Sequence, residues 1–158
     1  MTKAPLTASH AESHKVARIL TPERLQRTGI LYARFALGAA FLAAVADRFG
    51  LWGKYGGWGN FANFIKYTEQ VNSFMPAAAI PFLAWAATLA ETFLGVGLII
   101  GVSPRWVALG SALLLAMFGI AMAISFGVKS PLDYSVFSAS AGALLLGLYQ
   151  YRGPASNS

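Results

Sequence analysis

Glu91 is the residue that most needs a chemical explanation, because it is the only charge in the apolar stretch WAATLAETFLGVGLIIG, residues 85 to 101. A charge near the centre of a membrane helix is disfavoured by ~2.5 to 3.5 kcal/mol on insertion scales, so an opposite charge beside it is the economical arrangement. Arg34 lies in the preceding apolar stretch, and a rise of ~1.5 Å per residue places it ~7.5 Å from Glu91 in depth. A long arginine side chain directed inward bridges much of that offset. We therefore predict an intramembrane ion pair between Arg34 and Glu91.

The sequence leaves three roles open for this pair. It can be a structural clamp that fixes the register of two helices. It can be an anchoring point or a polar ligand site, because ionisable residues inside a membrane mark functional sites by default. In the third case Glu91 is protonated and only hydrogen-bonded. One acidic and one basic group suit a proton relay less well.

A second cluster is expected where ADRFGLWGKYGGWG, residues 46 to 59, faces GVKSPLDYSVF, residues 127 to 137, at the outer ends of the helices. Its charges roughly cancel, which leaves a tyrosine and an indole to hydrogen-bond the polar head of a ligand. Plainer explanations are a capping box, aromatic residues at the membrane interface and solvated charges. The glycines of the first segment suit either a lid or a loop. The candidate outer ligand site consists of Asp47, Arg48, Trp52, Lys129, Asp133 and Tyr134.

Several kinds of chemistry are excluded by residue types. The chain has no cysteine, so it holds no disulfide, no thiolate-bound iron–sulfur cluster and no thiol redox centre. Its two histidines, His10 and His14, precede the first apolar stretch, so we expect neither a metal site nor histidine-ligated haem in the helices. No catalytic residue is assigned, and any redox role requires a borrowed cofactor.

The elements that position these residues are predicted to be membrane helices. Of the 158 residues 56% are hydrophobic and 11% charged, about half the charged fraction of a soluble domain. Each apolar stretch is close to the ~20 residues that a helix needs to cross the hydrocarbon core. We predict an all-α, polytopic membrane protein with a four-transmembrane-helix bundle at residues 29–152. Its spans cover about 29–47, 77–100, 105–126 and 133–151, after a polar basic tail at 1–28 and before a short tail at 153–158.

Smaller features support this segmentation. Thr21-Pro22, Ser103-Pro104 and Ser130-Pro131 each place a capping hydroxyl before a proline, as at a helix start. Between the first two spans, apolar residues from Phe61 to Phe74 partly follow a helical spacing, which predicts a short helix in the outer interface.

The net charge of +6 is interpreted by the side of the membrane, and nucleic acid is not expected as a partner. Seven cations against four favour both termini on the cytoplasmic side. The inner seven are Lys3, Lys15, Arg18, Arg24, Arg27, Arg105 and Arg152, and the outer four are Arg48, Lys54, Lys66 and Lys129.

The chain resembles the DoxX family of small bacterial and archaeal four-helix membrane proteins. The resemblance rests on RFALGAAF from Arg34, ETFLGVGLIIG from Glu91, ADRFGLWG and KSPLDYSVF, and it covers about residues 29 to 150. Arg34 with Leu37-Gly38, and Glu91 with Gly95 and Gly101, stand where that family carries its helix-one arginine and its acidic-glycine pattern. The family takes its name from subunits associated with thiosulfate:quinone oxidoreduction and quinol oxidase complexes.

The resemblance implies a redox-linked subunit of the bacterial cytoplasmic (inner) membrane, more an accessory subunit of an oxidoreductase than an independent enzyme. It implies quinone or a similar lipophilic molecule as a non-covalent cofactor, with membrane lipid and redox proteins as partners. A homo-oligomer is compatible with the sequence. The alternative is a non-enzymatic small transporter, lipid-binding protein or membrane scaffold, which the absence of any nucleophile constellation favours.

Overall fold

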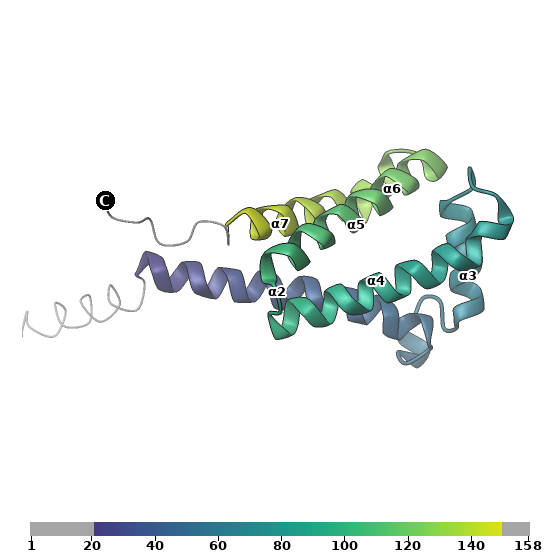
Figure 1. Cartoon of the computed structure of the whole chain (residues 1–158). Coiled ribbons are helices and arrows are strands. Elements are labelled where there is room, and N and C mark those ends of the chain that lie inside the picture. The colour runs from purple at the N-terminus through teal and green to yellow at the C-terminus, as the bar shows by residue number, and fades with distance from the viewer. Residues whose placement is uncertain (1–20, 150–158) are drawn as a thin grey trace, which may run out of the picture. The chain divides into compact units, whose positions relative to one another are not determined.

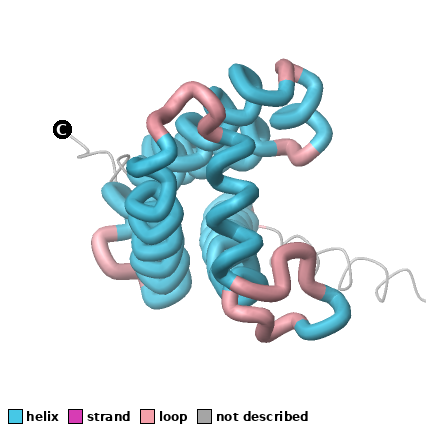
Figure 2. The backbone as a smooth tube through the Cα atoms, turned by 90° about the vertical axis from the view of Figure 1, so that its right-hand side faces the viewer, coloured by secondary structure: helices cyan, strands magenta, loops and turns pink. Residues whose placement is uncertain are grey.

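The computed structural model describes residues 21–149, which are helical with no strand (Figures 1 and 2). Tyr32 and Ala33 mark a boundary between two units: the first contributes the opening turns of the first helix, and the second contains every other described element. The helices are α2 (Pro22–Arg48), α3 (Phe61–Val71), α4 (Ile80–Ile100), α5 (Pro104–Phe126), α6 (Lys129–Asp133) and α7 (Val136–Tyr149), with single 3-10 turns at Gly53–Tyr55 and Ala77–Ala79.

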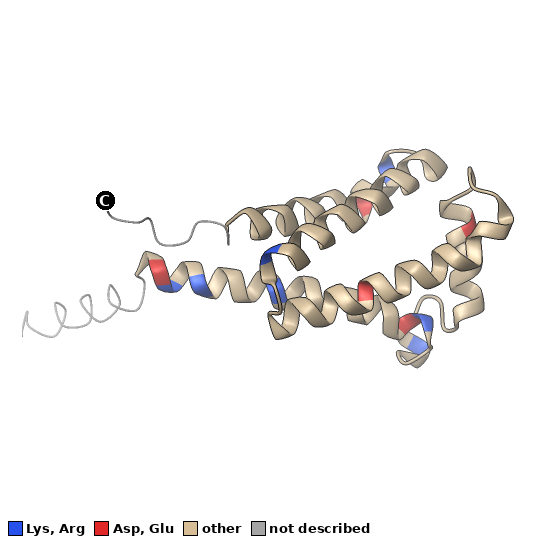
Figure 3. Cartoon of the chain, in the orientation of Figure 1, with Lys and Arg blue, Asp and Glu red and all other residues tan. Residues whose placement is uncertain are grey.

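Within residues 21–149, three segments are long and apolar enough to cross a membrane: Pro22–Arg48, Ala77–Ile100 and Pro104–Phe126. The chain is therefore a multi-pass membrane protein. Figure 3 shows how few charges α4, α5 and α7 carry. The fourth predicted span corresponds to α7, of which the structure describes the 14 residues Val136–Tyr149, fewer than the three longer segments have. The count of four spans therefore stays a prediction.

The proline signals located two of the three helix starts. α2 begins at Pro22 and α5 at Pro104. The Ser103 side chain makes no capping hydrogen bond, however, because its backbone lies in the left-handed region with φ of 41°. The third prediction is wrong: Pro131 lies inside α6, and α7 starts after Ser135, whose φ of 54° separates the two helices.

α2 and α4 cross antiparallel at two glycines. A Cβ atom at Gly38 would come within 2.9 Å of the Gly95 carbonyl oxygen, and one at Gly95 within 3.1 Å of the Gly38 carbonyl oxygen. Such a close approach is how membrane helices gain packing energy when apolar burial no longer drives association. The crossing fixes which residues of the two helices share one depth.

α5 and α7 form a second antiparallel pair. The Phe137 ring packs over Gly119, Leu109 packs over Gly147, and the Ser140 hydroxyl donates a hydrogen bond of 2.8 Å to the Ala112 carbonyl oxygen. Figure 1 shows the two helices side by side. The short helix expected between the first two spans is α3, in which Phe64, Thr68 and Val71 are buried.

α3 connects the two helix pairs at one end. Its Phe61 ring lies 4.4 Å from the Trp85 ring of α4. At its other end, the Ser125 hydroxyl of α5 donates a 2.7 Å hydrogen bond to the Val71 carbonyl oxygen. The end of the bundle that carries α3 is called the α3 end below. That α3 lies in the membrane interface stays a prediction.

Candidate functional site

A cavity of about 660 Å³ lies among α2, α3, α4, α5 and α7. Its walls are mostly apolar, and its polar groups gather toward the α3 end. The apolar lining includes Leu37, Phe41, Ala44, Leu115, Phe118, Ala121, Met122 and Ala139. The polar side chains of the lining are Asp47, Arg48, Tyr67, Thr68, Asn72, Glu91 and Tyr134.

The wall on α2 and α4 contains a buried ion pair between Arg48 and Glu91. Arg48 Nη2 lies 2.6 Å from Glu91 Oε1 and 2.7 Å from Oε2, and Arg48 Nη1 donates a 2.9 Å hydrogen bond to the Thr88 hydroxyl. Both residues are only 2% exposed. The charges therefore compensate each other where no solvent reaches them, the condition under which a buried pair is tolerated.

Aromatic rings cover the arginine. The Arg48 Cζ atom lies 3.8 Å from the centre of the Phe64 ring and 5.7 Å from that of Trp58, and these two rings meet edge to face at 5.1 Å. A guanidinium over an aromatic face is attracted by the ring quadrupole, most strongly when water is excluded. The pair is thus enclosed between α4 and an aromatic cover.

The prediction that Arg34 pairs with Glu91 is wrong. The Gly38–Gly95 crossing puts Arg34 level with Ile99, which is ~12 Å along α4 from Glu91 at ~1.5 Å per residue. Helical side chains also lean toward the N-terminus of their own helix. Arg48 therefore leans down α2 toward Glu91, and Glu91 leans up α4 toward Arg48. Arg34 leans away from both.

Arg34 instead caps the end of α4. Its Nε donates a 2.8 Å hydrogen bond to the Leu98 carbonyl oxygen, and its Nη2 lies 3.4 Å from the Ile99 carbonyl oxygen. α4 ends at Gly101, whose φ of 86° suits a glycine C-cap. A cation at a helix C-terminus also complements the macrodipole. Arg34 is thus structural here and does not line the cavity.

The candidate outer ligand site divides in the structure. Asp47, Arg48 and Tyr134 line the cavity. Lys129 and Asp133 form an exposed pair at 2.5 Å, one turn apart on α6. The Trp52 indole donates a 2.9 Å hydrogen bond to the Ala43 carbonyl oxygen and is not part of the lining. Ligand binding at the first three residues stays a prediction.

Asp47 organises the glycine-rich segment that follows α2. Its Oδ2 accepts hydrogen bonds from the backbone N–H groups of Gly57 at 2.9 Å and Trp58 at 3.2 Å. Asp47 Oδ1 is buried, and no side chain fits at Gly56, because a Cβ atom there would overlap it. This segment therefore holds Trp58 in place over Arg48.

Sequence reasoning missed the contributions of α3 and of Thr88. Tyr67, Thr68 and Asn72 line the cavity, and Phe64 covers Arg48. The amphipathic spacing of α3 indicated a buried face, but it did not indicate what that face covers. Thr88 stands one helical turn before Glu91, a spacing that places a hydroxyl on the same face.

Comparison with known proteins identifies a family. A family model described as methylamine utilisation protein MauE matches residues 26–135. No curated protein and no solved structure matches.

The DoxX resemblance is wrong, because the matching family is a different one. The residues that suggested it have general structural roles: Gly38 and Gly95 form the helix crossing, and Gly101 ends α4 beside Arg34. Antiparallel membrane helices of many families need small residues at such positions, so these motifs did not identify the family.

Proposed function

This chain belongs to the MauE family, and we propose that it is a membrane accessory protein which binds a lipophilic molecule in the cavity beside the Arg48–Glu91 pair. The cavity carries this proposal. Its volume of about 660 Å³ lies within the range of small-molecule sites, and an apolar wall with a few convergent polar groups is typical of them. The family description connects the role to methylamine utilisation.

The lining favours binding over catalysis. Its two carboxylates are held within the protein: Glu91 by Arg48, and Asp47 by two backbone N–H groups at Oδ2, while Asp47 Oδ1 is buried without a hydrogen-bond partner in residues 21–149. Catalysis by a general acid or base needs a group whose proton can be exchanged with the substrate. Neither carboxylate is open to a substrate in this arrangement, so the cavity suits recognition of an intact molecule.

A quinone remains one candidate ligand, although the DoxX resemblance and the role as an oxidoreductase subunit no longer support it. What supports a quinone is only that the cavity combines an apolar wall with a polar end. The scaffold alternative draws on a different observation, the close Gly38–Gly95 crossing, which makes the α2–α4 pair a rigid element.

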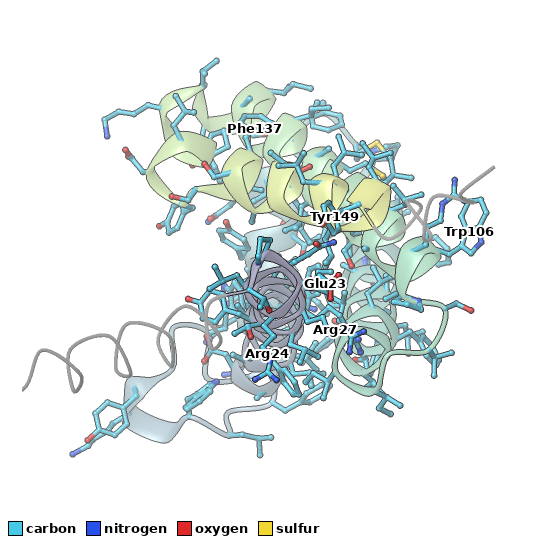
Figure 4. The ribbon with its side chains drawn as sticks, turned by 90° about the vertical axis from the view of Figure 1, so that its left-hand side faces the viewer. Glu23, Arg24, Arg27, Trp106, Phe137 and Tyr149 are labelled. Atoms are coloured by element: carbon cyan, nitrogen blue, oxygen red, sulfur yellow. The ribbon has the colours of Figure 1, made fainter. Side chains whose placement is uncertain are left out.

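We propose the bacterial cytoplasmic (inner) membrane as the location, with both termini cytoplasmic and the α3 end outside. The cations support this orientation. Arg24 and Arg27 lie on the first turns of α2 (Figure 4). Arg105 lies at the start of α5, with its Cζ atom 5.2 Å from the centre of the Trp106 ring. Trp106 is 69% exposed and suits a membrane interface. We also propose that the protein works with partner proteins and self-associates in the membrane.

The binding proposal is tested by filling the cavity. Ala121 of α5 lines it, whereas the neighbouring Ile120 is exposed and does not. Protein purified in mild detergent is analysed by native mass spectrometry and by organic extraction. We expect a co-purifying lipophilic molecule that Ala121→Phe displaces and Ile120→Phe retains. Equal retention by both variants would favour the scaffold alternative.

A further inference from the structure

We infer that the cavity takes an uncharged lipophilic molecule whose head carries an oxygen acceptor or hydroxyl, held by Tyr67, Tyr134 and Asn72. The inference rests on the proposed binding function and specifies its ligand. It depends on which polar groups of the lining remain open to a ligand.

The charged groups of the lining are buried or bonded within the protein, although Arg48 Nε and Asp47 Oδ1 have no hydrogen-bond partner in residues 21–149. Arg48 and Glu91 compensate each other at 2.6 and 2.7 Å and are 2% exposed. Asp47 accepts two backbone hydrogen bonds through Oδ2, and its Oδ1 is buried against Gly56. Because Arg48 and Glu91 are 2% exposed and Asp47 Oδ1 is buried, a charged head would lose its hydration without reaching a counter-ion, which is costly in a low-dielectric site.

The hydrogen-bonding groups at the α3 end are not occupied in this way. Among residues 21–149 neither phenol hydroxyl, of Tyr67 or of Tyr134, has a hydrogen-bond partner, although both side chains line the cavity. Tyr134 is 73% exposed, so it lines the cavity where it opens to the surface, and unlike Tyr55 it belongs to the lining. Asn72 uses its amide nitrogen to donate 2.9 Å to the Thr68 carbonyl oxygen, which leaves its Oδ1 as an acceptor. The site thus offers two hydroxyl groups and one acceptor.

The two tyrosines converge from different elements. Tyr67 lies on α3, where its ring is 5.6 Å from that of Trp58 and 6.5 Å from that of Phe126. Tyr134 follows α6. Burial raises the pKa of Tyr67 above its ordinary value of 10.0, and the proximity of Tyr134 adds to that shift. Both features keep the Tyr67 phenol neutral and able to donate.

The cavity has a polar end and an apolar end. Its open polar groups lie at the α3 end, while Leu37, Leu115 and Ala139 line it farther along α2, α5 and α7. A molecule with a polar head and an apolar tail fits this gradient, with the head at Tyr67 and Tyr134 and the tail between α2 and α7. Since only uncharged hydrogen-bonding groups are open, a phospholipid or an alkylammonium is a poor match.

The test uses one tail with four heads. A variant with Trp52, Trp85 and Trp106 replaced by phenylalanine retains Trp58, which lines the cavity, as the reporter. In nanodiscs, a decyl-substituted benzoquinone should quench Trp58 saturably. At equal mole fraction in the membrane, 1-decanol should compete, while decanoate and decylammonium should compete at least about tenfold more weakly.

Three substitutions in the same background locate the head group. Tyr67→Phe and Tyr134→Phe should each weaken quinone binding roughly two- to tenfold, the value of one neutral hydrogen bond. Tyr55→Phe is the matched control, because Tyr55 is 82% exposed and outside the lining.

The outcomes separate the two proposals. If Ala121→Phe abolishes saturable quenching but decanoate or decylammonium competes as well as 1-decanol, binding stands and the neutral-head inference is overturned. Unchanged affinity in both tyrosine variants overturns it too. If Ala121→Phe leaves quenching as it was, the quinone only partitions into the membrane, and the proposed function fails together with the inference.

Discussion

Removing either member of the Arg48–Glu91 pair should cost far more stability than removing both. In Arg48→Met the Glu91 carboxylate keeps its burial and loses its cation, and in Glu91→Leu the guanidinium loses two bonds, of 2.6 and 2.7 Å. With 2% exposure on each residue, water cannot take the place of the lost partner. An uncompensated buried charge costs ~3 to 5 kcal/mol in soluble proteins, and insertion scales give ~2.5 to 3.5 kcal/mol at the centre of a membrane helix.

The double variant replaces the pair with apolar side chains of similar length, which is often close to neutral. We therefore expect each single variant to lose ~3 kcal/mol or more, the double variant to lose less than either, and the coupling energy to be at least ~3 kcal/mol. The assay is reversible unfolding in mixed micelles titrated with dodecyl sulfate, followed by circular dichroism.

A second cycle, between Arg34→Met and Glu91→Leu, is the control. Within residues 21–149, Arg34 bonds to the Leu98 and Ile99 carbonyl oxygens and to no carboxylate, so its loss should add to that of Glu91 without coupling. Additive losses in the Arg48–Glu91 cycle, or equal coupling in the two cycles, would show that the register argument is incorrect.

Three further predictions concern packing, pH and topology. Gly38→Ala should destabilise the protein, because its Cβ atom would lie 2.8 Å from Ile99 Cγ1. A Cβ atom at Gly29 meets nothing within 4 Å in the described chain, so Gly29→Ala should be neutral or stabilise by up to ~1 kcal/mol. The free energies of unfolding of the two variants check this. The raised pKa of Tyr67 means that the folded state holds this proton more tightly than the unfolded state. The stabilising contribution of the neutral phenol is therefore complete below pH 10.0 and is lost as pH rises beyond it. Above pH 10.0 the free energy of unfolding should fall less steeply in Tyr67→Phe than in the wild type, and identical slopes would contradict the shift. Single cysteines at Ser9, Asn63 and Ser156 tested in intact cells with a membrane-impermeant maleimide should label only at Asn63, and labelling at the two terminal positions alone would reverse the orientation.

The helices were predictable because the length of each apolar stretch can be counted directly in the sequence. Each predicted span contains most of an observed helix, and Thr21-Pro22 located the start of α2. The start of α7 was not predictable in the same way, because Ser130-Pro131 belongs to α6 and the break comes at Ser135. A proline marks where a helix can begin, but a left-handed residue nearby can place the beginning elsewhere.

The site was harder to predict, because it depends on lateral register and side-chain direction. Glu91 was identified as the residue that needs a partner, and Arg48 was identified as a candidate ligand residue, but the two were assigned to different clusters. Depth counted from the helix ends favoured Arg34, whereas the glycine crossing and the lean of the side chains favour Arg48. The buried face of α3 could be recognised, but the helices that it would cover depend on the tertiary fold.

The Arg48–Glu91 pair joins the end of one membrane segment to the middle of the next, and this has a consequence for biogenesis. While the chain is being inserted into the bilayer, α4 enters lipid carrying a carboxylate that Arg48 of α2 compensates in the folded protein. Release of α4 without α2 would leave the Glu91 carboxylate unpaired in hydrocarbon. The insertion machinery should therefore hold α2 at its lateral gate until α4 arrives, so that the two leave together as a helical hairpin.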